Sequence, residues 1–412
     1  MPAGSSRALA LVVTTISDGA FLRRYAAAVR THSGPEQIRI YVVADLNTPP
    51  ECARVADALV SEGLDVRFLG VERQREFLRP FPELEALIRY RSDERRNIGY
   101  LIAMQEEADV VISVDDDNVP LDGDSFFLEH AVTGRVFTGP STASQTRWFN
   151  LGSLLESKDR HGAHVVIYPR GFPYAQRGLD DSSTVAACDS GLVGINVGLW
   201  SGDPDIDAAT RLVLAPNVSR PRAPQAWLLA PGLRSPINTQ NTGLVREAMP
   251  AYWFVRMGAL LSGVGIGRFG DIFSGYFAQL ACEAAGHRIR VGSPWLHQDR
   301  NAHRLLTDLQ MELRGMDLIE DLIPLLEEPL LPASNYLDPT RELAERLMRF
   351  SETHARFRSC PGAAEFLRDT ASSMKLWVSV CVALAGGEAS LAARRVRSEL
   401  QQATAAQAHA LQ

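Results

Sequence analysis

Three consecutive carboxylates, Asp115, Asp116 and Asp117, follow a run of mostly β-branched residues, Val110–Val114. Closely spaced anions repel one another by more than about 1 kcal/mol even at a high effective dielectric, so a compensating cation is expected. Mg²⁺ and Mn²⁺ prefer such oxygen ligands. Because side chains alternate along a strand, the sequence predicts that Asp115 and Asp117 bind the metal, although the reverse split stays open at a turn. The alternative is a solvated aspartate-rich turn or a helix cap.

The residues before this triplet predict the elements that position it. Strand-like segments at 9–16, 38–45, 64–70 and 108–117 alternate with helix-like segments. Such alternation indicates a parallel sheet covered on both faces, in which ligands bind beyond the carboxyl ends of the strands. Thr14 and Asp45 lie at such ends, as does the triplet. A nucleotide-binding crevice is therefore expected there, with Asp116 free to contact a ribose or sugar hydroxyl.

The second half of the sequence breaks this alternation. Aromatic, glycine and turn residues recur in 165–178 and 193–207, and these segments are expected to be loops that build the site. A proline-rich passage at 215–236 predicts a surface excursion. Segment 237–250 contains Asn241, and a glycine-rich turn then leads to a helix that ends at Gly286. A strand and a loop carrying His297 are expected to follow.

Composition excludes several classes of protein. With 412 residues, 46% hydrophobic and 22% charged, the chain has an ordinary globular composition. The net charge of -7 and the absence of a long Lys/Arg run argue against a nucleic-acid partner. Five scattered cysteines without CxxC spacing predict neither a zinc site nor a disulfide framework, which fits a reducing cytoplasm. No apolar run reaches about 18 residues, so a membrane span is not expected.

The sequence after Asn335 differs in character from the rest. Segments with helical spacing follow one another there, separated by Pro and Gly. We therefore expect two parts, with residues 1–335 as the ligand-binding domain and residues 336–412 as a helical C-terminal extension. The extension is expected to pack on the core or to serve assembly, for example as a homo-oligomer.

Several motifs occur in a fixed order around the triplet. They are RNIGY at 96–100, YPRGFPYAQRG at 168–178, VGLWSGDPDID at 197–207, GRFGDIFSGYF at 267–277 and SPWLHQDRN at 293–301. Over residues 8–347 the sequence resembles the reversibly glycosylated polypeptide family, whose plant members are UDP-arabinopyranose mutases. The resemblance implies a GT-A type, Rossmann-like α/β fold with a mostly parallel sheet, a UDP-sugar ligand, and Mn²⁺ or Mg²⁺ held by the aspartates. It also places the family's self-glycosylated arginine at Arg177.

The chain departs from this family at several positions. Asn118 follows the three aspartates where family members have Cys. A family motif with two aspartates after an arginine and an aromatic residue is reduced here to Gly270 and Asp271, after Arg268 and Phe269. The proline-rich insertion and the C-terminal helices also differ from the plant proteins. The resemblance therefore predicts the fold and the class of sugar donor. It leaves open whether the chain is a mutase and which molecule is the acceptor.

Cleavage between an anomeric carbon and phosphate leaves a diphosphate with growing negative charge, which a metal and nearby cations stabilise. Asp271 is predicted to contact the sugar or act as general base, with a helix cap as its alternative. His297 is predicted to bind metal or phosphate. Arg177 is predicted to be a cation near the diphosphate or the glycosylated residue, and either role predicts that Arg177→Ala lowers turnover at least about tenfold. The predicted nucleotide-sugar contacts are Thr14, Asp45, Arg96, Asp116, Arg170, Arg268 and Asn241.

Three functions remain open at this point. The first is metal-dependent transfer of a sugar from a nucleoside diphosphate sugar to an unknown acceptor, in bacterial natural-product or glycan biosynthesis. The second is a mutase that interconverts pyranose and furanose forms of a UDP-sugar, with self-glycosylation at Arg177. The third is a nucleotide-sugar-binding scaffold that has lost catalysis, suggested by Gly270 at the position of a carboxylate.

Overall fold

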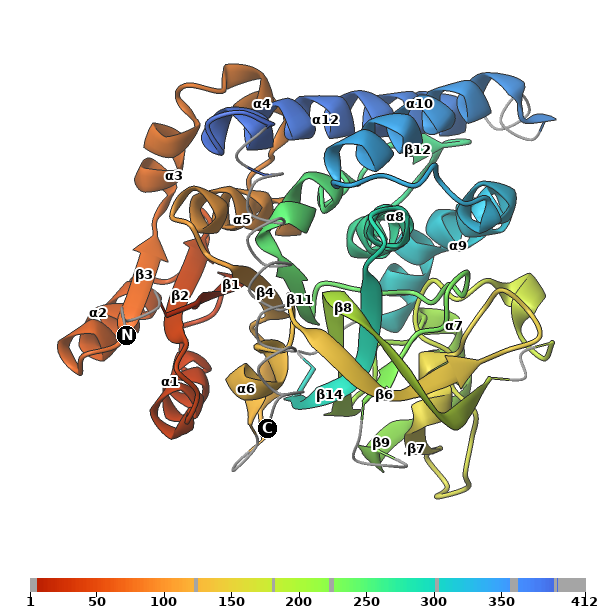
Figure 1. The fold of residues 1–412 in the computed structure, drawn as a ribbon, viewed down its shortest axis with the longest axis horizontal. Helices are drawn as coiled ribbons and strands as arrows, with labels where there is room; N and C mark the ends of the chain where they lie inside the picture. The colour runs from red at the N-terminus through yellow and green to blue at the C-terminus, as the bar shows by residue number, and fades with distance from the viewer. Residues whose placement is uncertain are drawn as a thin grey trace, which may run out of the picture.

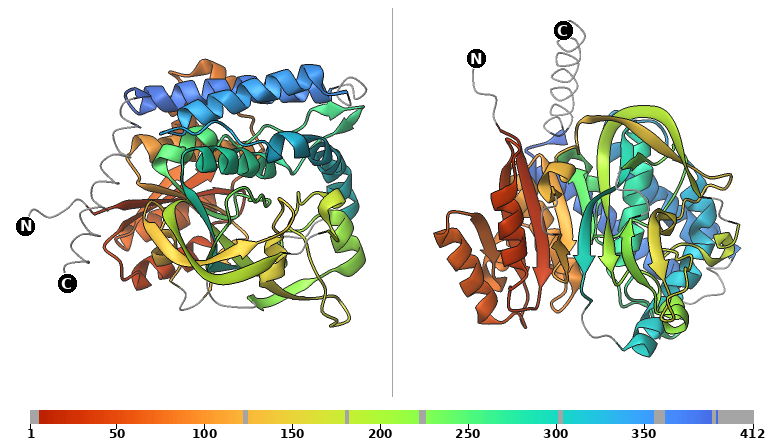
Figure 2. Two further views of the ribbon diagram at one scale, coloured as in Figure 1. Left: turned by 45° about the vertical axis from the view of Figure 1, so that its right-hand side comes forward. Right: turned by 90° about the horizontal axis from the view of Figure 1, so that it is seen from below.

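One twelve-stranded sheet with helices on both faces organises the chain (Figures 1 and 2). The computed structural model describes residues 6–121, 125–179, 182–221, 226–300, 304–355, 362–388 and 391. Its first four strands are β1 (Ala8–Thr15), β2 (Gln37–Ala44), β3 (Asp65–Leu69) and β4 (Val110–Asp115). They pair in the order β3-β2-β1-β4, and all three pairings are parallel. The four strands predicted from the sequence are thereby confirmed.

Helices cover both faces of this parallel half. They are α1 (Leu22–Thr31), α2 (Pro50–Ser61), α3 (Val71–Leu78), α4 (Pro82–Leu87) and α5 (Arg96–Gln105), the last preceded by the 3-10 turn η1 (Asp93–Arg95). Alternation along β1 explains the burial on two sides. Leu9, Leu11 and Val13 pack into one hydrophobic cluster with α1 and α2, whereas Ala10 and Val12 pack into another with α5. Each face removes apolar surface from water, the main driving force of folding.

The helical region at residues 82–105, before β4, is interrupted by a turn. Arg91 has a left-handed φ of 55°, and the Ser92 hydroxyl caps η1 by accepting from the Glu94 N–H at 3.3 Å. A left-handed residue cannot continue an α-helix, so α4 and η1 are separate. The Ser92 N–H donates to Asp45 Oδ2 at 3.2 Å. The turn is thereby held against the carboxyl end of β2.

Mainly antiparallel strands form the second half of the sheet. The longest is β8 (Ser183–Gly202), which pairs antiparallel with β6 (Val136–Ala143) and β11 (Asn241–Val245) and parallel with β14 (Arg288–Gln298). The expectation that 193–207 is a loop is wrong up to Gly202. Alternate apolar residues such as Val193, Ile195 and Val197 are buried there. A Cβ on the intervening Gly198 would lie 2.1 Å from Asn241 Nδ2, so the glycines reflect close packing rather than a turn.

The remaining elements complete the architecture. They are β5 (Asn118–Pro120), α6 (Phe126–His130), η2 (Leu151–Leu154), β7 (Leu155–Lys158), η3 (Tyr174–Gln176), α7 (Ala208–Leu214), β9 (Asn217–Pro221), β10 (Trp227–Leu228), η4 (Arg246–Ala251), β12 (Leu260–Leu261), β13 (Val264–Gly265), α8 (Gly270–Ala284), α9 (Leu305–Glu327), α10 (Leu337–Thr353) and α12 (Ala363–Leu384). The main sheet runs β3-β2-β1-β4-β11-β8-β6-β10-β14-β5, with β7 and β9 to the side. The predicted α/β class is confirmed.

The predicted C-terminal helices are present and lie along the side of the sheet that carries α5 and α8 (Figures 1 and 2). Leu343, Leu347 and Trp377 belong to the same hydrophobic cluster as α5, and Trp377 Nε1 donates to the Met249 carbonyl at 2.8 Å. The helices therefore complete the main core. In the described part of the chain, no helix is both long and apolar enough to cross a membrane.

Candidate active site

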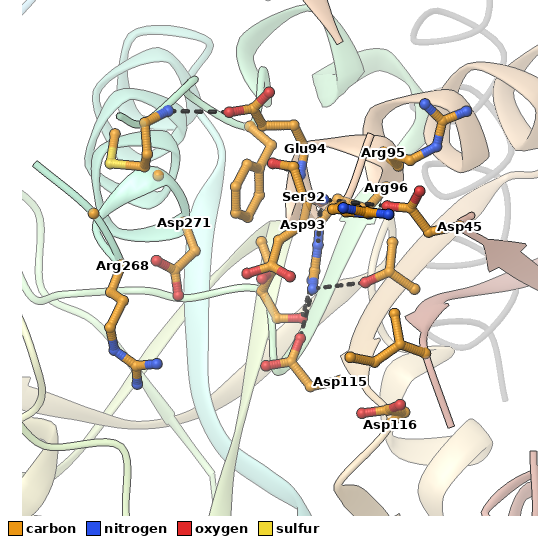
Figure 3. A pocket seen from close by; sticks show the side chains of 18 of the residues that line it. Asp45, Ser92, Asp93, Glu94, Arg95, Arg96, Asp115, Asp116, Arg268 and Asp271 are labelled. Atoms are coloured by element: carbon orange, nitrogen blue, oxygen red, sulfur yellow. Dashed lines mark hydrogen bonds and ion pairs between the residues drawn. The ribbon is translucent and has the colours of Figure 1, made fainter. Parts of the chain in front are cut away.

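A pocket of about 740 Å³ opens beyond the carboxyl ends of the parallel strands (Figure 3). Its walls come from β1, β2, β4, the turn before α5, the start of α8 and the end of β14. Of the predicted site residues, those that line it are Thr14, Asp45, Arg96, Asp115, Asp116, Asp117, Arg170, Arg268 and Asp271. The topology therefore brings most of the predicted residues to one place.

Each aspartate of the triplet has a different partner. Asp115 Oδ1 accepts from Arg96 Nη2 at 2.7 Å, and Asp116 Oδ2 accepts from the Thr15 hydroxyl at 2.7 Å. Asp117 Oδ1 accepts from a neutral amide donor, Asn118 Nδ2, at 2.8 Å. All three carboxylates still line the pocket. The triplet is thus part of a cavity wall rather than a solvated turn.

The charge of the triplet is not fully balanced by the protein. Burial, followed by the charges of Asp115 and Asp116, raises the pKa of Asp117 to about 7, although Arg300 acts to lower it. A carboxyl group with such a pKa is in an environment that disfavours its anion. The excess negative charge expected from the sequence is therefore found at this strand end.

Arg96 is fixed by protein acceptors on several sides. Besides Asp115, its guanidinium donates to Thr14 Oγ1 at 3.1 Å and Ser113 Oγ at 3.2 Å. Burial acts to lower the pKa of Arg96, but Asp115 and other nearby groups raise it above its usual value. Arg96 therefore remains a cation, and its main role in this structure is to hold the end of β4 beside the end of β1.

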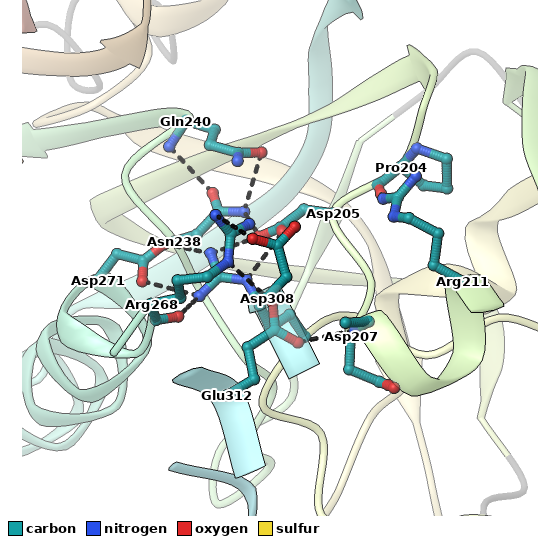
Figure 4. A network of polar contacts seen from close by, with 12 residues as sticks. Pro204, Asp205, Asp207, Arg211, Asn238, Gln240, Arg268, Asp271, Asp308 and Glu312 are labelled. Atoms are coloured by element: carbon teal, nitrogen blue, oxygen red, sulfur yellow. Dashed lines mark hydrogen bonds and ion pairs between the residues drawn. The ribbon is translucent and has the colours of Figure 1, made fainter. Parts of the chain in front are cut away.

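Asp271 lies in a buried network of polar contacts (Figure 4). Arg170 donates to both oxygens of Asp205 at 2.9 and 3.0 Å, and to both oxygens of Asp271 at 3.1 and 2.7 Å. Asp271 occupies the first turn of α8, but the residue at the N-cap is Phe269. Because Asp271 faces Arg170 and the pocket, the alternative role of a helix cap does not apply.

Arg268 and Arg300 place two further guanidinium groups at the pocket. Arg268 Nε donates to Glu312 Oε1 at 2.9 Å, and a left-handed φ of 56° at Arg268 turns the chain into α8. Arg300 follows β14; its Nη2 lies 3.6 Å from Asp205 Oδ1, and its buried Nε has no partner among the described residues. Both guanidinium groups therefore keep donors for an anionic ligand.

Two predicted residues are on strands but outside the pocket. Asn241 is buried in β11, where its amide accepts from His130 Nε2 at 3.0 Å and donates to the carbonyls of Leu199 and Pro294 at 3.1 and 2.9 Å. Its role here is to join strands. His297 lies within β14, not in a loop, and its Nδ1 is 3.3 Å from Ser201 Oγ. Because side chains alternate along a strand, the neighbouring Gln298 lines the pocket instead.

Arg177 also lies outside the residues that line the pocket. Its Nη2 donates to Asp207 Oδ2 at 2.8 Å, its Nη1 donates to Thr210 Oγ1 at 3.2 Å, and its guanidinium lies 3.7 Å from the centre of the Tyr174 ring. The expected placement over the crevice is not observed, because this set of partners holds the side chain against α7.

Among the polar pocket residues that the sequence analysis missed are Asp93, Gln298 and Arg300. Gln298 and Arg300 stood in the motif that pointed to His297, and counting alternate positions along the strand identifies them. Backbone contacts join this segment to the triplet, since the Asp299 N–H donates to the Asp117 carbonyl at 3.0 Å. Asp93 had no signal beyond its position at the start of a helix before the triplet strand.

Carboxylates and arginines at the carboxyl ends of parallel strands are typical of nucleotide-binding α/β proteins. Residues 57–384 match the profile of the reversibly glycosylated polypeptide family, and the chain belongs to that family. A probable UDP-arabinopyranose mutase 2 of Solanum tuberosum is 26% identical over 300 residues, which cover 70% of this chain and 73% of the relative. UDP-arabinopyranose mutase 1 of Arabidopsis thaliana is 26% identical over 298 residues, covering 70% and 75%. The resemblance seen in the sequence is confirmed.

Solved structures show a weaker likeness. Glucosyl-3-phosphoglycerate synthase from Mycobacterium tuberculosis, in complex with Mn²⁺, UDP and glucosyl-3-phosphoglycerate, is 11% identical with a TM-score of 0.36, covering 76% of this chain and 78% of that one. S. aureus TarS in complex with UDP-GlcNAc is 12% identical with a TM-score of 0.39, covering 97% and 92%. At these scores the likeness adds nothing to the family assignment.

Proposed function

We propose that the protein is a metal-dependent glycosyltransferase that uses a nucleoside diphosphate sugar, with UDP as the nucleotide because its relatives are named as acting on UDP-arabinopyranose. The observation that carries the proposal is the triplet at the head of the pocket. Arg96 and Arg300 lie beside it, yet the pKa of Asp117 stays raised, mainly by burial and then by its two neighbours. Such a site favours a cation together with an anionic ligand.

Asp115 and Asp117 are the residues that would hold Mn²⁺ or Mg²⁺. Among the described residues no three His, Cys, Asp or Glu side chains form a complete metal site, so other oxygen atoms must complete the shell. Gln298 fits this need: its amide is buried at the pocket, and its Oε1 has no partner in the described part of the chain. Substrate phosphates would supply the remaining ligands. A bound metal would neutralise charge that develops on the diphosphate.

The protein's own side chains have separate tasks in this scheme. Arg268 and Arg300 bind phosphate oxygens, for which the planar guanidinium is well suited. As the bond between the anomeric carbon and the diphosphate oxygen breaks, the acceptor oxygen bonds to that carbon and its proton passes to Asp271. Arg170 orients Asp271 through its two hydrogen bonds. The acceptor is unidentified.

A mutase is the second candidate, and the names of the relatives favour it. In that reaction the same bond to the diphosphate breaks, and a second hydroxyl oxygen of the sugar bonds to the anomeric carbon while the bond from that carbon to the original ring oxygen breaks. The proton of the attacking hydroxyl passes to the released ring oxygen, and the diphosphate bonds again to the anomeric carbon. The geometry does not favour Arg177 as a covalent carrier, because its guanidinium pairs with Asp207 and lies against Tyr174. A mutase on this chain would therefore work without that adduct.

One assay separates these candidates. The full chain is incubated with UDP-glucose, UDP-galactose, UDP-xylose and UDP-arabinopyranose, with Mn²⁺, Mg²⁺ or EDTA, and nucleotides are separated by chromatography. UDP released in proportion to an added sugar or alcohol acceptor supports the transferase. A ring-isomerised donor supports the mutase, and binding without either product supports a scaffold. Equal affinity in EDTA would contradict the role of the metal.

A further inference from the structure

Asp93 is the one carboxylate lining the pocket whose side chain has no hydrogen-bond or ion-pair partner within the described ranges. It is the first residue of η1, and its side chain is exposed to the cavity. The other carboxylates that line the pocket each have a partner: Asp45, Glu94, Asp115, Asp116, Asp117 and Asp271. A charged acceptor left free in a pocket is available to a ligand.

Charged side chains on the walls of the pocket influence Asp93 without bonding directly to its carboxylate. Figure 3 shows its carboxylate directed into the same space as those of Asp115 and Asp271, which come from opposite walls. Desolvation between these walls raises the pKa of Asp93; Arg96 and Arg268 lower it, whereas Asp115 and Asp271 raise it. The carboxylates do not form a group of three that would hold a second metal ion, at least among the residues that the structure describes. A neutral ligand that donates hydrogen bonds suits this arrangement better than an anion.

A second polar group in the pocket also lacks a partner. The Gln298 side chain is 2% exposed, and neither its Nε2 nor its Oε1 makes a hydrogen bond to the described residues. Leaving such a buried amide unsatisfied is costly, so it is expected to meet a ligand. An amide both donates and accepts, whereas an ionised carboxylate only accepts. With Oε1 assigned to the metal shell, the Gln298 Nε2 remains as a donor that complements the acceptor Asp93, and together these two groups match the hydroxyls of a sugar.

We propose that Asp93 binds hydroxyl groups of the donor's sugar and selects a neutral sugar over a sugar acid. This inference rests on the proposed use of a UDP-sugar. A uronic acid would bring its carboxylate into a space that already holds those of Asp93 and Asp271, and like charges repel. A neutral hexose or pentose would instead donate its hydroxyl protons to Asp93. Asp93 therefore determines donor specificity, whereas the triplet serves the diphosphate end.

Calorimetry with Mn²⁺ tests this on the full chain, using UDP, UDP-glucose, UDP-galactose, UDP-glucuronate and UDP-galacturonate. We expect the wild type to bind the better of the two neutral donors at least about tenfold more tightly than the matching uronate, about 1.4 kcal/mol. Asp93→Asn should lower the affinity for that neutral donor by about tenfold and leave the affinity for UDP within twofold of the wild-type value. The ratio between the affinities for the neutral donor and for the uronate should fall. Asp57→Asn, an exposed change on α2, should alter none of these affinities.

The remaining outcomes would overturn the inference in different ways. Unchanged affinities in Asp93→Asn, with wild-type thermal stability, would leave Asp93 without a ligand role. Equal weakening of UDP and UDP-sugars would place Asp93 at the nucleotide. A second Mn²⁺ per chain that Asp93→Asn removes would make it a metal ligand. If the wild type binds none of the nucleotides, the proposed function fails first and this inference falls with it.

Discussion

The pocket and the surroundings of Arg177 are both built from arginine and aspartate, but they differ in how completely the charges are paired. Asp207 accepts from Arg177, from the Thr210 N–H and hydroxyl, and from the Tyr174 hydroxyl. In the pocket, Asp93 has no partner among the described residues and Asp117 accepts from a neutral amide donor. A cluster whose charges are all paired stabilises the fold, whereas a cluster with unpaired carboxylates at a cavity can bind a ligand.

Arg170 belongs to the pocket but is paired as fully as Arg177, so its removal should have the largest effect of all. Arg170→Ala would leave Asp205 and Asp271 buried without their guanidinium partner. We expect a loss of about 3–5 kcal/mol in the free energy of unfolding, because breaking a buried ion pair leaves uncompensated charge. Urea unfolding measures it. A loss below about 1 kcal/mol would mean that the network does not hold the pocket together.

Asp117→Asn should have a large effect on catalysis and little effect on folding. The change keeps the size of the side chain but removes a charge that we assign to the metal, so we expect turnover of the preferred UDP-sugar to fall by about 100-fold, about 2.7 kcal/mol. Steady-state rates over a Mn²⁺ series provide the measurement, with Asp57→Asn as the control. Wild-type rates at low Mn²⁺ would exclude Asp117 as a ligand.

Arg177→Ala should affect stability rather than turnover. The sequence predicted at least about a tenfold loss of turnover, but Arg177 lies outside the pocket in the structure. We now expect less than about threefold change in rate and a loss of about 2 kcal/mol in stability, smaller than for Arg170→Ala because Asp207 keeps three hydrogen bonds. Rates and urea unfolding give both numbers. A sugar adduct mapped to Arg177 by intact-mass and peptide analysis would reverse this interpretation.

The smallest expected effect is a dependence of stability on pH in the metal-free protein. The pKa of Asp117 is about 7 in the folded state, raised by burial and by its two neighbours, and near its ordinary value of about 3.9 when unfolded. Between these values the folded state binds more protons, so the free energy of unfolding should fall as pH rises from about 4 to about 7. Urea midpoints at several pH values should show a shallower decline in Asp117→Asn. An identical slope in both proteins would exclude Asp117 as its source.

The parallel half of the fold and its side of the pocket were predictable because their signals are local. Runs of β-branched residues alternate with helical segments, and Thr14, Asp45 and Asp115 end the strands. Sequence order alone then places these residues at one edge of the sheet. Arg170, Arg268 and Asp271 were predicted instead from the ordered motifs, whereas a residue such as Asp93 depends on contacts between distant segments, for which a single sequence has no comparable signal.

The predicted residues that lie elsewhere show which information was missing. The direction of His297 depends on where β14 ends, and a strand that includes His297 turns Gln298 to the pocket instead. Asn241 faces His130 because of the register between β11 and its neighbours. Arg177 depends on Asp207, which lies thirty positions later in the sequence. Each residue type was plausible for the chemistry, but the strand register and the pairing decided its position.

The packing of the C-terminal helices has a consequence for anyone who wishes to shorten the chain. α12 packs against α4 and α5, and α5 with its leading turn η1 carries Arg96 and Asp93 into the pocket. Ending the chain at residue 335 would therefore expose the apolar side of α5 and loosen the wall that these two residues form. We expect such a shortened protein to be poorly soluble and to lose nucleotide affinity, since the last helices support this wall of the pocket from its outer side.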